Sequence, residues 1–361
     1  MNDNTDTDDL GTEQTVRVIS LDMRERFFNA LRGSELDRMP AACPLQTGVL
    51  DLMKLCNAYW PQAHRDARKM ALLSLAANTY AGVESARLPF DMMLDAEALG
   101  AKIAYADKVT MPFLTESPIH MLEDVRQLDV PEVRDAGRVP LIDEAIGIIK
   151  RKRPDLPIIV AVQAPFTLST QLRGLDKAMM DLASQPEHFR DFVDFFARWS
   201  SFAASHFIEA GADTIMMVDS GANDSFLGPE LYESFALPGQ RKVVDSIEAD
   251  GAPSILHICD DVRLSTDMMA RSGVDAISIG QEMSITKTKE VVNGRCRVIG
   301  NIDPSGVLLN GTSRQVTSGV RRCLKEGVDI VAPGCGLSAH TPLENLKAMT
   351  DAIRKYGLRK R

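Results

Sequence analysis

The sequence predicts one (β/α)8 barrel with an N-terminal helical extension and an insertion in its first third. Short apolar segments of about four to six residues alternate with longer amphipathic segments, which is typical of βαβ units around a parallel sheet. About eight such strands fit into roughly 320 residues, and eight is the number that closes this kind of barrel. An open doubly wound sheet is the alternative, but no Gly-x-Gly-x-x-Gly loop follows the first expected strand.

The first third of the chain is expected to be the least regular part. Amphipathic segments stop at Gly33 and Gly82, and glycine is a common helix-ending residue. Two short apolar runs after residue 100 predict a hairpin outside the main repeat. In chain order we expect a helix at 22–31, a strand at 39–45, helices from 49 and at 64–82, a strand at 84–90, and hairpin strands at 102–105 and 109–113.

From residue 141 onward the alternation becomes regular. Apolar runs bounded by turn residues predict strands, and apolar stripes at helical spacing predict helices between them. The predicted strands are 157–162, 213–218, 253–258, 276–279, 297–299 and 328–331. The predicted helices are 141–150, 186–210, 229–235, 239–249, 262–271, 285–292, 313–326 and 342–356.

The chain carries 41 basic and 50 acidic residues, which gives a formal net charge of −9. A nucleic-acid partner is not expected, because phosphate binding needs a basic footprint. No apolar run approaches the roughly 18 residues that cross a bilayer, so no membrane segment is expected either. Six cysteines in a chain of this length are not a disulfide framework, which favours a reducing, cytoplasmic location.

The first residues differ in composition from the rest. Five acidic residues precede Arg17, the first basic residue, and large apolar residues are scarce among them. Residues 1–15 are therefore expected to form a disordered acidic tail, and residues 16–361 the single barrel domain. The tail has neither the basic start nor the apolar stretch of a secretory signal.

Polar side chains collect just past the carboxyl ends of the expected strands, the face on which barrel enzymes place their active sites. They are Gln46, Asp91, Gln163, Asp219, His257, Cys259, Gln281, Glu282, Asn301, Asp303 and Cys335. The predicted substrate-binding residues among them are Gln163, Asp219, Gln281 and Asn301. For Gln163 and Asp219, buried structural hydrogen bonding is an equal alternative.

Three of these side chains form a candidate metal site. His257 and Cys259 are expected to share one face of a strand, because residues i and i+2 point to the same side. Cys335 follows the last expected strand between two glycines. Zn²⁺ prefers imidazole and thiolate ligands, and three protein ligands with an open fourth position are typical of a catalytic zinc. The alternatives are three unrelated buried residues, or a binding module whose purely structural metal is closed by a fourth protein ligand.

Three stretches resemble the uroporphyrinogen decarboxylase-like superfamily: His257-Ile258-Cys259, Gly334-Cys335-Gly336 before Thr341-Pro342, and residues 300–304. They resemble more closely its zinc-dependent branch, the methylcobamide:coenzyme M methyltransferases. The resemblance covers nearly the whole chain from about Met23. It includes Arg38-Met39-Pro40, Gln46-Thr47, Ala58-Tyr59-Trp60-Pro61 with His64, Arg87-Leu88-Pro89-Phe90, Gly211-Ala212-Asp213-Thr214 and Leu237-Pro238.

The resemblance implies the (β/α)8 barrel of that superfamily and a zinc ion held by His257, Cys259 and Cys335. It also implies methyl transfer from methylcobalamin, carried by a partner corrinoid protein, to a small thiol, with coenzyme M as the expected acceptor. The thiolate form of a thiol is the nucleophile, and zinc deprotonates a coordinated thiol. The protein is therefore expected to be a zinc-dependent methyltransferase.

One departure concerns the strand that follows the His-x-Cys strand, where zinc-branch relatives carry an acid near the metal. Here that position is Gly280, followed by Gln281 and Glu282. Three interpretations stay open. The loop has drifted, or Glu282 substitutes as a further zinc ligand, or the acceptor differs from coenzyme M.

Two other activities on the same fold are weighed as alternatives. The first is a corrinoid-dependent methyltransferase with a methoxylated or methylamine-type donor, or with a pterin acceptor. It would share the barrel and the zinc. The second is uroporphyrinogen decarboxylation, which is disfavoured because it needs arginines near the first strand and residues 41–48 contain none. The decarboxylases also do not use the cysteine pair.

Overall fold

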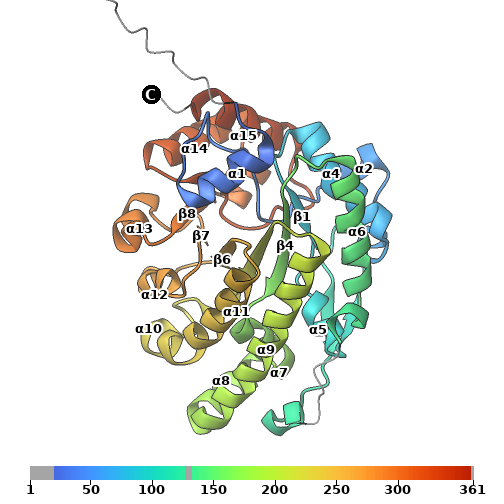
Figure 1. Cartoon of the computed structure of the whole chain (residues 1–361), viewed down its shortest axis with the longest axis vertical. Coiled ribbons are helices and arrows are strands. Elements are labelled where there is room, and N and C mark those ends of the chain that lie inside the picture. The colour runs from blue at the N-terminus through green and yellow to red at the C-terminus, as the bar shows by residue number, and fades with distance from the viewer. Residues whose placement is uncertain (1–19, 127–131, 359–361) are drawn as a thin grey trace, which may run out of the picture.

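The computed structural model describes residues 20–126 and 132–358, so the predicted acidic tail at 1–15 lies outside the described residues. Within that range, a curled sheet of parallel strands occupies the centre and helices surround it (Figure 1). The seven strands lie in the order β1-β4-β5-β6-β7-β8-β9. The predicted barrel-type α/β fold is confirmed.

The strands of this sheet form the core of the molecule. Nearly every residue in them is buried, because helices cover the outer face and side chains fill the interior. Strands buried on both faces appear in a sequence as apolar runs, which explains why they could be predicted. They are β1 (Ala86–Leu88), β4 (Ile158–Gln163), β5 (Thr214–Val218), β6 (Ser254–Ile258), β7 (Ala276–Ile279), β8 (Arg297–Ile302) and β9 (Ile330–Pro333).

The strand predicted at 39–45 is wrong, because this segment has no regular strand pairing. Pro40 and Pro44 provide the physical reason, since proline has no backbone N–H to donate to a ladder. The segment nevertheless lies between the two ends of the sheet. The carbonyl of Ala41 accepts a hydrogen bond from the N–H of Glu84, just before β1, at 2.8 Å. The carbonyl of Gln46 accepts one from the N–H of Leu337, just after β9, at 3.3 Å.

The helices follow the predicted alternation, with differences at their ends and two stretches, 94–98 and 165–184, for which no helix was predicted. In the described ranges they are α1 (Met23–Arg32), α2 (Leu50–Cys56), α3 (Gln62–Arg65), α4 (Ala67–Ala81), α5 (Leu94–Ala98), α6 (Val139–Lys152), α7 (Pro165–Arg173), α8 (Leu175–Ser184), α9 (Pro186–Ala210), α10 (Gly228–Leu231), α11 (Leu237–Ala249), α12 (Thr266–Arg271), α13 (Ile285–Val292), α14 (Ser313–Lys325) and α15 (Leu343–Tyr356). None of these helices is long and apolar enough to cross a membrane.

The helix predicted at 64–82 is divided into α3 and α4 at Asp66. Asp66 has an extended backbone, and its side chain accepts a hydrogen bond from the N–H of Lys69 at 3.0 Å. Aspartate is disfavoured inside a helix and favoured at this capping position. The capping residue therefore sets the start of α4, which the apolar periodicity alone did not reveal.

Replacing Asp66 by alanine is expected to lower the free energy of unfolding by about 1 kcal/mol, because one N–H at the start of α4 loses its acceptor. Chemical denaturation monitored by circular dichroism measures this change. Asp66→Ser is the matched control, since serine is also a good cap and should retain most of the stability. Equal losses in the two variants would show that the carboxylate acts in another way.

The predicted hairpin outside the main repeat is also present. β2 (Lys102–Ala104) pairs antiparallel with β3 (Phe113–Glu116), somewhat later in the chain than the expected 109–113. The loop between the two strands brings Met111 and Pro112 to the wall of a cavity at the carboxyl ends of the barrel strands. The insertion thus contributes to the candidate site described next.

Candidate metal centre

His257, Cys259 and Cys335 lie together in the structure. His257 is part of β6, Cys259 directly follows that strand, and Cys335 follows β9. The Nε2 atom of His257 lies 3.1 Å from the sulfur of Cys259, and that sulfur lies 3.2 Å from the sulfur of Cys335. All three donor atoms fall within 4.8 Å of one another, so one ion could contact all of them.

Glycine at position 334 allows the chain around Cys335 to approach its neighbour. A Cβ atom there would lie 2.6 Å from the backbone nitrogen of Gln281, in the loop after β7. Backbone atoms cannot move aside as the tip of a flexible side chain can, so any larger residue would push the two loops apart. Close packing therefore requires glycine at position 334, and this glycine allows the loops after β7 and β9 to contact each other.

Ser278 on β7 sets the orientation of the His257 ring. The Nδ1 atom of His257 lies 3.1 Å from both the carbonyl oxygen and the hydroxyl of Ser278. A carbonyl oxygen can only accept, so Nδ1 carries the proton and Nε2 keeps its lone pair. That lone pair faces the sulfur of Cys259. This is the tautomer a metal ligand needs, and a hydrogen bond of this kind commonly fixes the ring of a metal-binding histidine.

The two sulfurs differ in their affinity for a proton. The pKa of Cys259 is lowered, first because Cys335 donates a hydrogen bond to it, although burial opposes this, and also because Ser220 donates to it. The Ser220 hydroxyl lies 3.4 Å from the sulfur. The same bond to Cys259, together with burial, raises the pKa of Cys335 to about 12. The two sulfurs are thus close enough for one to donate its proton to the other, and a cation bound by both would displace the proton between them.

The cluster opens into a cavity of about 270 Å³. This is slightly below the usual range for drug-sized ligands, so the cavity suits a small molecule. Most of its wall is apolar. The residues that line it are Leu45, Gln46, Arg87, Phe90, Asp91, Met92, Met93, Met111, Pro112, Val218, Ser220, His257, Cys259, Cys335 and Gly336.

Arg87 is the lining residue whose importance the sequence did not reveal. It was expected at or beyond the end of a strand, but it is the middle residue of β1 and only 4% exposed. Asp91, one of the predicted strand-end residues, lines the same cavity. Its carboxylate accepts hydrogen bonds from both Nη atoms of Arg138 at 3.0 and 2.8 Å and lies 2.8 Å from Nδ1 of His64. The sequence did contain one signal for Arg87, namely a charged residue between the apolar residues Ala86 and Leu88.

Comparison with known proteins identifies the relatives of this chain. The family model described as uroporphyrinogen decarboxylase (URO-D) matches residues 22–356. The chain belongs to the URO-D family. It is 37% identical over 335 residues to a methylcobamide:CoM methyltransferase, MtbA, from Methanosarcina acetivorans, which is 92% of this chain and 98% of the relative. A methylated-thiol–coenzyme M methyltransferase from Methanosarcina mazei is 34% identical over 91% of this chain and 88% of its own length.

A solved structure agrees with these sequence relatives. A methyltransferase from Methanosarcina mazei matches this URO-D family member with a TM-score of 0.89 and 31% identity, covering 93% of this chain and 99% of that one. The resemblance to methylcobamide:coenzyme M methyltransferases predicted from the motifs is thereby confirmed. The prediction that the protein is a methyltransferase is supported by the same relatives.

None of the four predicted substrate-binding residues is among those that line the cavity of this URO-D family member, and the side chains of Asp219 and Asn301 have internal partners. The fully buried Asp219 accepts hydrogen bonds from the N–H and hydroxyl of Thr167 and from the amide of Gln240. The side-chain amide of Asn301 donates to the carbonyls of Gly280 and Met283 at 2.8 and 2.7 Å. Gln163, 2% exposed, bonds through its backbone to Asp95 and Ser200. For Asp219 the geometry therefore favours the structural alternative.

The fourth of these residues, Gln281, and Glu282, which was considered as a further zinc ligand, lie beside the cluster. Gln281 packs against Gly334, and its side-chain amide donates a hydrogen bond to Glu282. Glu282 is exposed and is not one of the residues grouped around the three donor atoms. Its charge nevertheless opposes the lowering of the Cys259 pKa, together with that of Asp260. Glu282 is thus near the sulfurs without contacting them in this arrangement.

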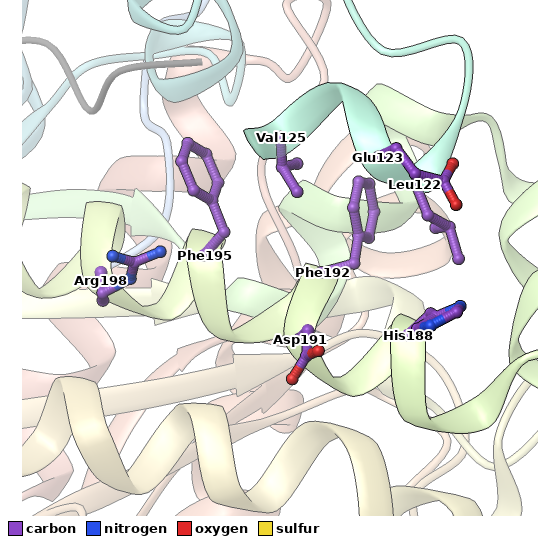
Figure 2. A pocket seen from close by; sticks show the side chains of 8 residues that line it. All are labelled: Leu122, Glu123, Val125, His188, Asp191, Phe192, Phe195 and Arg198. Carbon is purple, nitrogen blue, oxygen red and sulfur yellow. The ribbon is translucent and has the colours of Figure 1, made fainter. Parts of the chain in front are cut away.

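A second cavity, of about 170 Å³, is lined by residues of α9 and of the short helix Leu122–Arg126 (Figure 2). Phe192 and Phe195 of α9 project toward Leu122 and Val125 of the short helix Leu122–Arg126, as Figure 2 shows. Its eight lining residues are Leu122, Glu123, Val125, His188, Asp191, Phe192, Phe195 and Arg198, and none of them lines the metal-site cavity. No cysteine is among them, so the group formed by His257, Cys259 and Cys335 belongs to the first cavity alone among these two.

Proposed function

We propose that this protein moves a methyl group from a methylated corrinoid protein to a small thiol, with coenzyme M as the acceptor. We further propose that His257, Cys259 and Cys335 hold a zinc ion for this reaction. The observation that carries the proposal is the convergence of these three donors in a chain 37% identical to a methylcobamide:CoM methyltransferase. One imidazole nitrogen and two sulfurs suit zinc, and three protein ligands leave a position for substrate.

The residues around the cluster have separate roles in this proposal. When bound, zinc supplies the Lewis acidity that keeps the substrate thiol in its thiolate form near neutral pH. Ser278 holds His257 in the tautomer whose Nε2 can bind a metal. Two cysteine sulfurs add negative charge, so electron density stays available on the substrate sulfur. That sulfur takes the methyl group, and the electron pair of the cobalt–carbon bond stays on the corrinoid.

The size of the cavity supports both a small acceptor and a separate methyl donor. A volume of about 270 Å³ accommodates a short thiol but cannot enclose a corrinoid macrocycle. The donor must therefore be presented from outside, which fits a corrinoid held by a partner protein. The same volume opposes uroporphyrinogen decarboxylation, because a tetrapyrrole would not fit. That substrate also carries many carboxylates, whereas Arg87 is the one arginine or lysine among the lining residues.

Metal analysis of the purified protein is expected to find about one zinc ion per chain. With methylcobalamin as donor, coenzyme M should be converted to its methyl thioether, because the zinc site activates the thiol. A strong chelator should remove the zinc and the activity together, and added Zn²⁺ should restore both. The hydroxyl analogue of coenzyme M is the matched control substrate, and no methylation of it is expected.

The same assay separates the remaining alternatives. A pterin that accepts the methyl group while thiols do not would favour the alternative acceptor and contradict the thiol proposal. Zinc present with neither acceptor methylated would indicate a structural metal. A zinc-free protein that methylates coenzyme M at the same rate would contradict the zinc mechanism.

A further inference from the structure

Arg87 is buried in the cavity wall with unused hydrogen-bond donors. It lies in the middle of β1 and is 4% exposed. Its Nε and Nη1 atoms are buried and have no hydrogen-bond partner among the residues that the structure describes. Its Nη2 atom lies 3.2 Å from the sulfur of Met92, which is only a weak acceptor. A buried arginine is normally paired, so unused donors in a cavity wall indicate a missing partner.

The nearest carboxylate does not supply that partner. Asp91 lines the same cavity, but both of its oxygens are already used by other groups. Arg138 donates to both oxygens, the N–H of Met93 donates to Oδ1 at 2.9 Å, and His64 lies against Oδ2. Asp91 still favours the charged form of Arg87 through space, while burial lowers the pKa of Arg87 to about 10. Arg87 therefore stays positively charged at neutral pH.

Most of the remaining cavity wall offers no other charge that could bind an anion. Besides Arg87, Asp91, Ser220 and the three candidate metal ligands, the polar residue in the wall is Gln46, whose side-chain amide has internal hydrogen-bond partners. It donates to the carbonyl of Leu337 and accepts from the N–H of Gly48 at 2.7 Å. The other lining side chains include Leu45, Phe90, Met92, Met93, Met111, Pro112 and Val218. In apolar surroundings a single cation attracts an anion more strongly than it would in water.

We propose that Arg87 binds the anionic end of the thiol substrate, so that the site selects short thiols carrying a sulfonate or carboxylate. The sulfur of such a substrate would face His257, Cys259 and Cys335, and its anionic group would accept hydrogen bonds from the guanidinium of Arg87. Uncharged thiols would leave these donors unpaired and bind more weakly. The inference rests on the proposed function, since it assigns to Arg87 the recognition of the thiol acceptor in the same reaction.

The test compares thiols in the zinc-loaded wild-type protein, with free methylcobalamin as donor. The probes are 2-mercaptoethanesulfonate, 3-mercaptopropionate, 2-mercaptoethanol and cysteamine, which carry a sulfonate, a carboxylate, no charge and a positive charge. We expect the two anionic thiols to be preferred by about 10- to 100-fold in kcat/KM, the effect of hydrogen bonds to a charged group. Ethanesulfonate, which lacks the thiol, should compete with the anionic thiols, whereas ethanol at equal concentration should not.

Two variants then assign the preference to Arg87. Arg87→Met keeps a long apolar side chain and should raise KM for the sulfonate by about 10- to 100-fold. Its zinc content should stay at the wild-type value, and its kcat/KM for 2-mercaptoethanol should fall much less than that for the sulfonate, because this thiol has no anionic group to bind. Arg87→Lys should recover part of the preference, because it restores the charge without the planar guanidinium. A merely structural role would lower the activity toward charged and uncharged thiols equally.

The outcomes separate the inference from the function on which it rests. Methylation of all four thiols at similar efficiency by the wild-type protein would overturn the role of Arg87 and leave methyl transfer to a thiol in place. No methylation of any thiol would overturn the proposed function itself. A wild-type preference for anionic thiols that survives unchanged in Arg87→Met would overturn the assignment to Arg87, because another group would then bind the anion.

Discussion

Replacing Cys335 by alanine is expected to remove the zinc ion and to lower methyl transfer to the thiol by about a thousandfold or more. Cys335 supplies one of three donor atoms, and its sulfur lies 3.2 Å from that of Cys259. A catalytic metal contributes several kcal/mol of stabilisation to the transition state, and each 1.36 kcal/mol corresponds to a factor of ten in rate. Zinc content by mass spectrometry of the purified variant and the rate with methylcobalamin and coenzyme M measure the two effects.

Cys323→Ala is the matched control. Cys323 is a fully buried cysteine of α14, and burial raises the pKa of its thiol, so it is not a nucleophile or ligand near neutral pH. Its removal should cost about 1 kcal/mol of stability through a small cavity, with zinc and activity retained. If Cys335→Ala kept zinc at the wild-type stoichiometry, the three-residue site would be refuted. If both variants lost activity equally, the loss would reflect impaired folding.

The regular part of the fold was predictable because its strands are buried on both faces. Apolar runs at 276–279 and helical stripes at 285–292 and 186–210 coincide with β7, α13 and α9. Residues 39–45 have the same apolar composition, but Pro40 and Pro44 remove the donors that a strand needs. Hydrophobicity alone therefore does not distinguish this segment from a strand, whereas its missing backbone N–H groups do. The break at Asp66 has the same origin, since a capping side chain competed with the helical periodicity.

The candidate metal site could be partly predicted from the sequence for a local reason. His257 and Cys259 are two residues apart at the end of a strand, so their side chains share a face. Their approach to Cys335, 76 residues away, follows from the curled sheet and could be expected only after the barrel was inferred. The resemblance to a known family supported the same three residues, and the distances add what no sequence contains, namely that all three donor atoms lie together.

The hydrogen bonds of the polar residues around the candidate site could not be predicted, because they depend on distant segments. Asn301 occupies a strand end like a substrate-binding residue, yet its amide holds the loop after β7. Arg87 and Asp91 are four residues apart and would be taken for an ion pair from the sequence. Asp91 is instead paired with Arg138, 47 residues further on, which leaves Arg87 without that partner. Which of two arginines pairs with a given carboxylate can be recognised only from the tertiary structure.

Replacing Arg138 by methionine is expected to lower the free energy of unfolding by about 3–5 kcal/mol at pH 7. Arg138 is 4% exposed and donates to both oxygens of Asp91, to Glu97 and to the backbone carbonyl of His64. Methionine fills a similar volume but cannot donate, so Asp91 would keep a buried charge with little compensation. Removing one partner of a buried ion pair costs this much because the other charge stays desolvated. Chemical denaturation at pH 7 measures the loss.

The pH dependence of the loss identifies its cause. Burial alone would raise the pKa of Asp91, but Arg138 and His64 hold it well below its usual range in the folded protein. In the wild type, the stabilisation from ionised Asp91 is therefore present above about pH 4 and is lost only as the pH falls below that value. In Arg138→Met the Asp91 pKa should rise instead, so the variant becomes less stable as the pH increases from about 4 to 7. The gap between wild type and variant should consequently narrow as the pH is lowered from 7 toward 5.

The double variant Asp91→Asn/Arg138→Met separates charge from packing. It removes both buried charges and retains similar side-chain volumes, so it should recover much of the stability lost in Arg138→Met. Residue 91 no longer ionises in this variant. Its free energy of unfolding should therefore vary less with pH between 5 and 7 than that of Arg138→Met. A loss in Arg138→Met that is constant with pH and is not recovered in the double variant would show that Arg138 stabilises the fold through packing against Tyr105 and its neighbours. In that case Arg138 would not stabilise the protein by pairing with the buried charge of Asp91, which lies beside the cavity that Arg87 also lines.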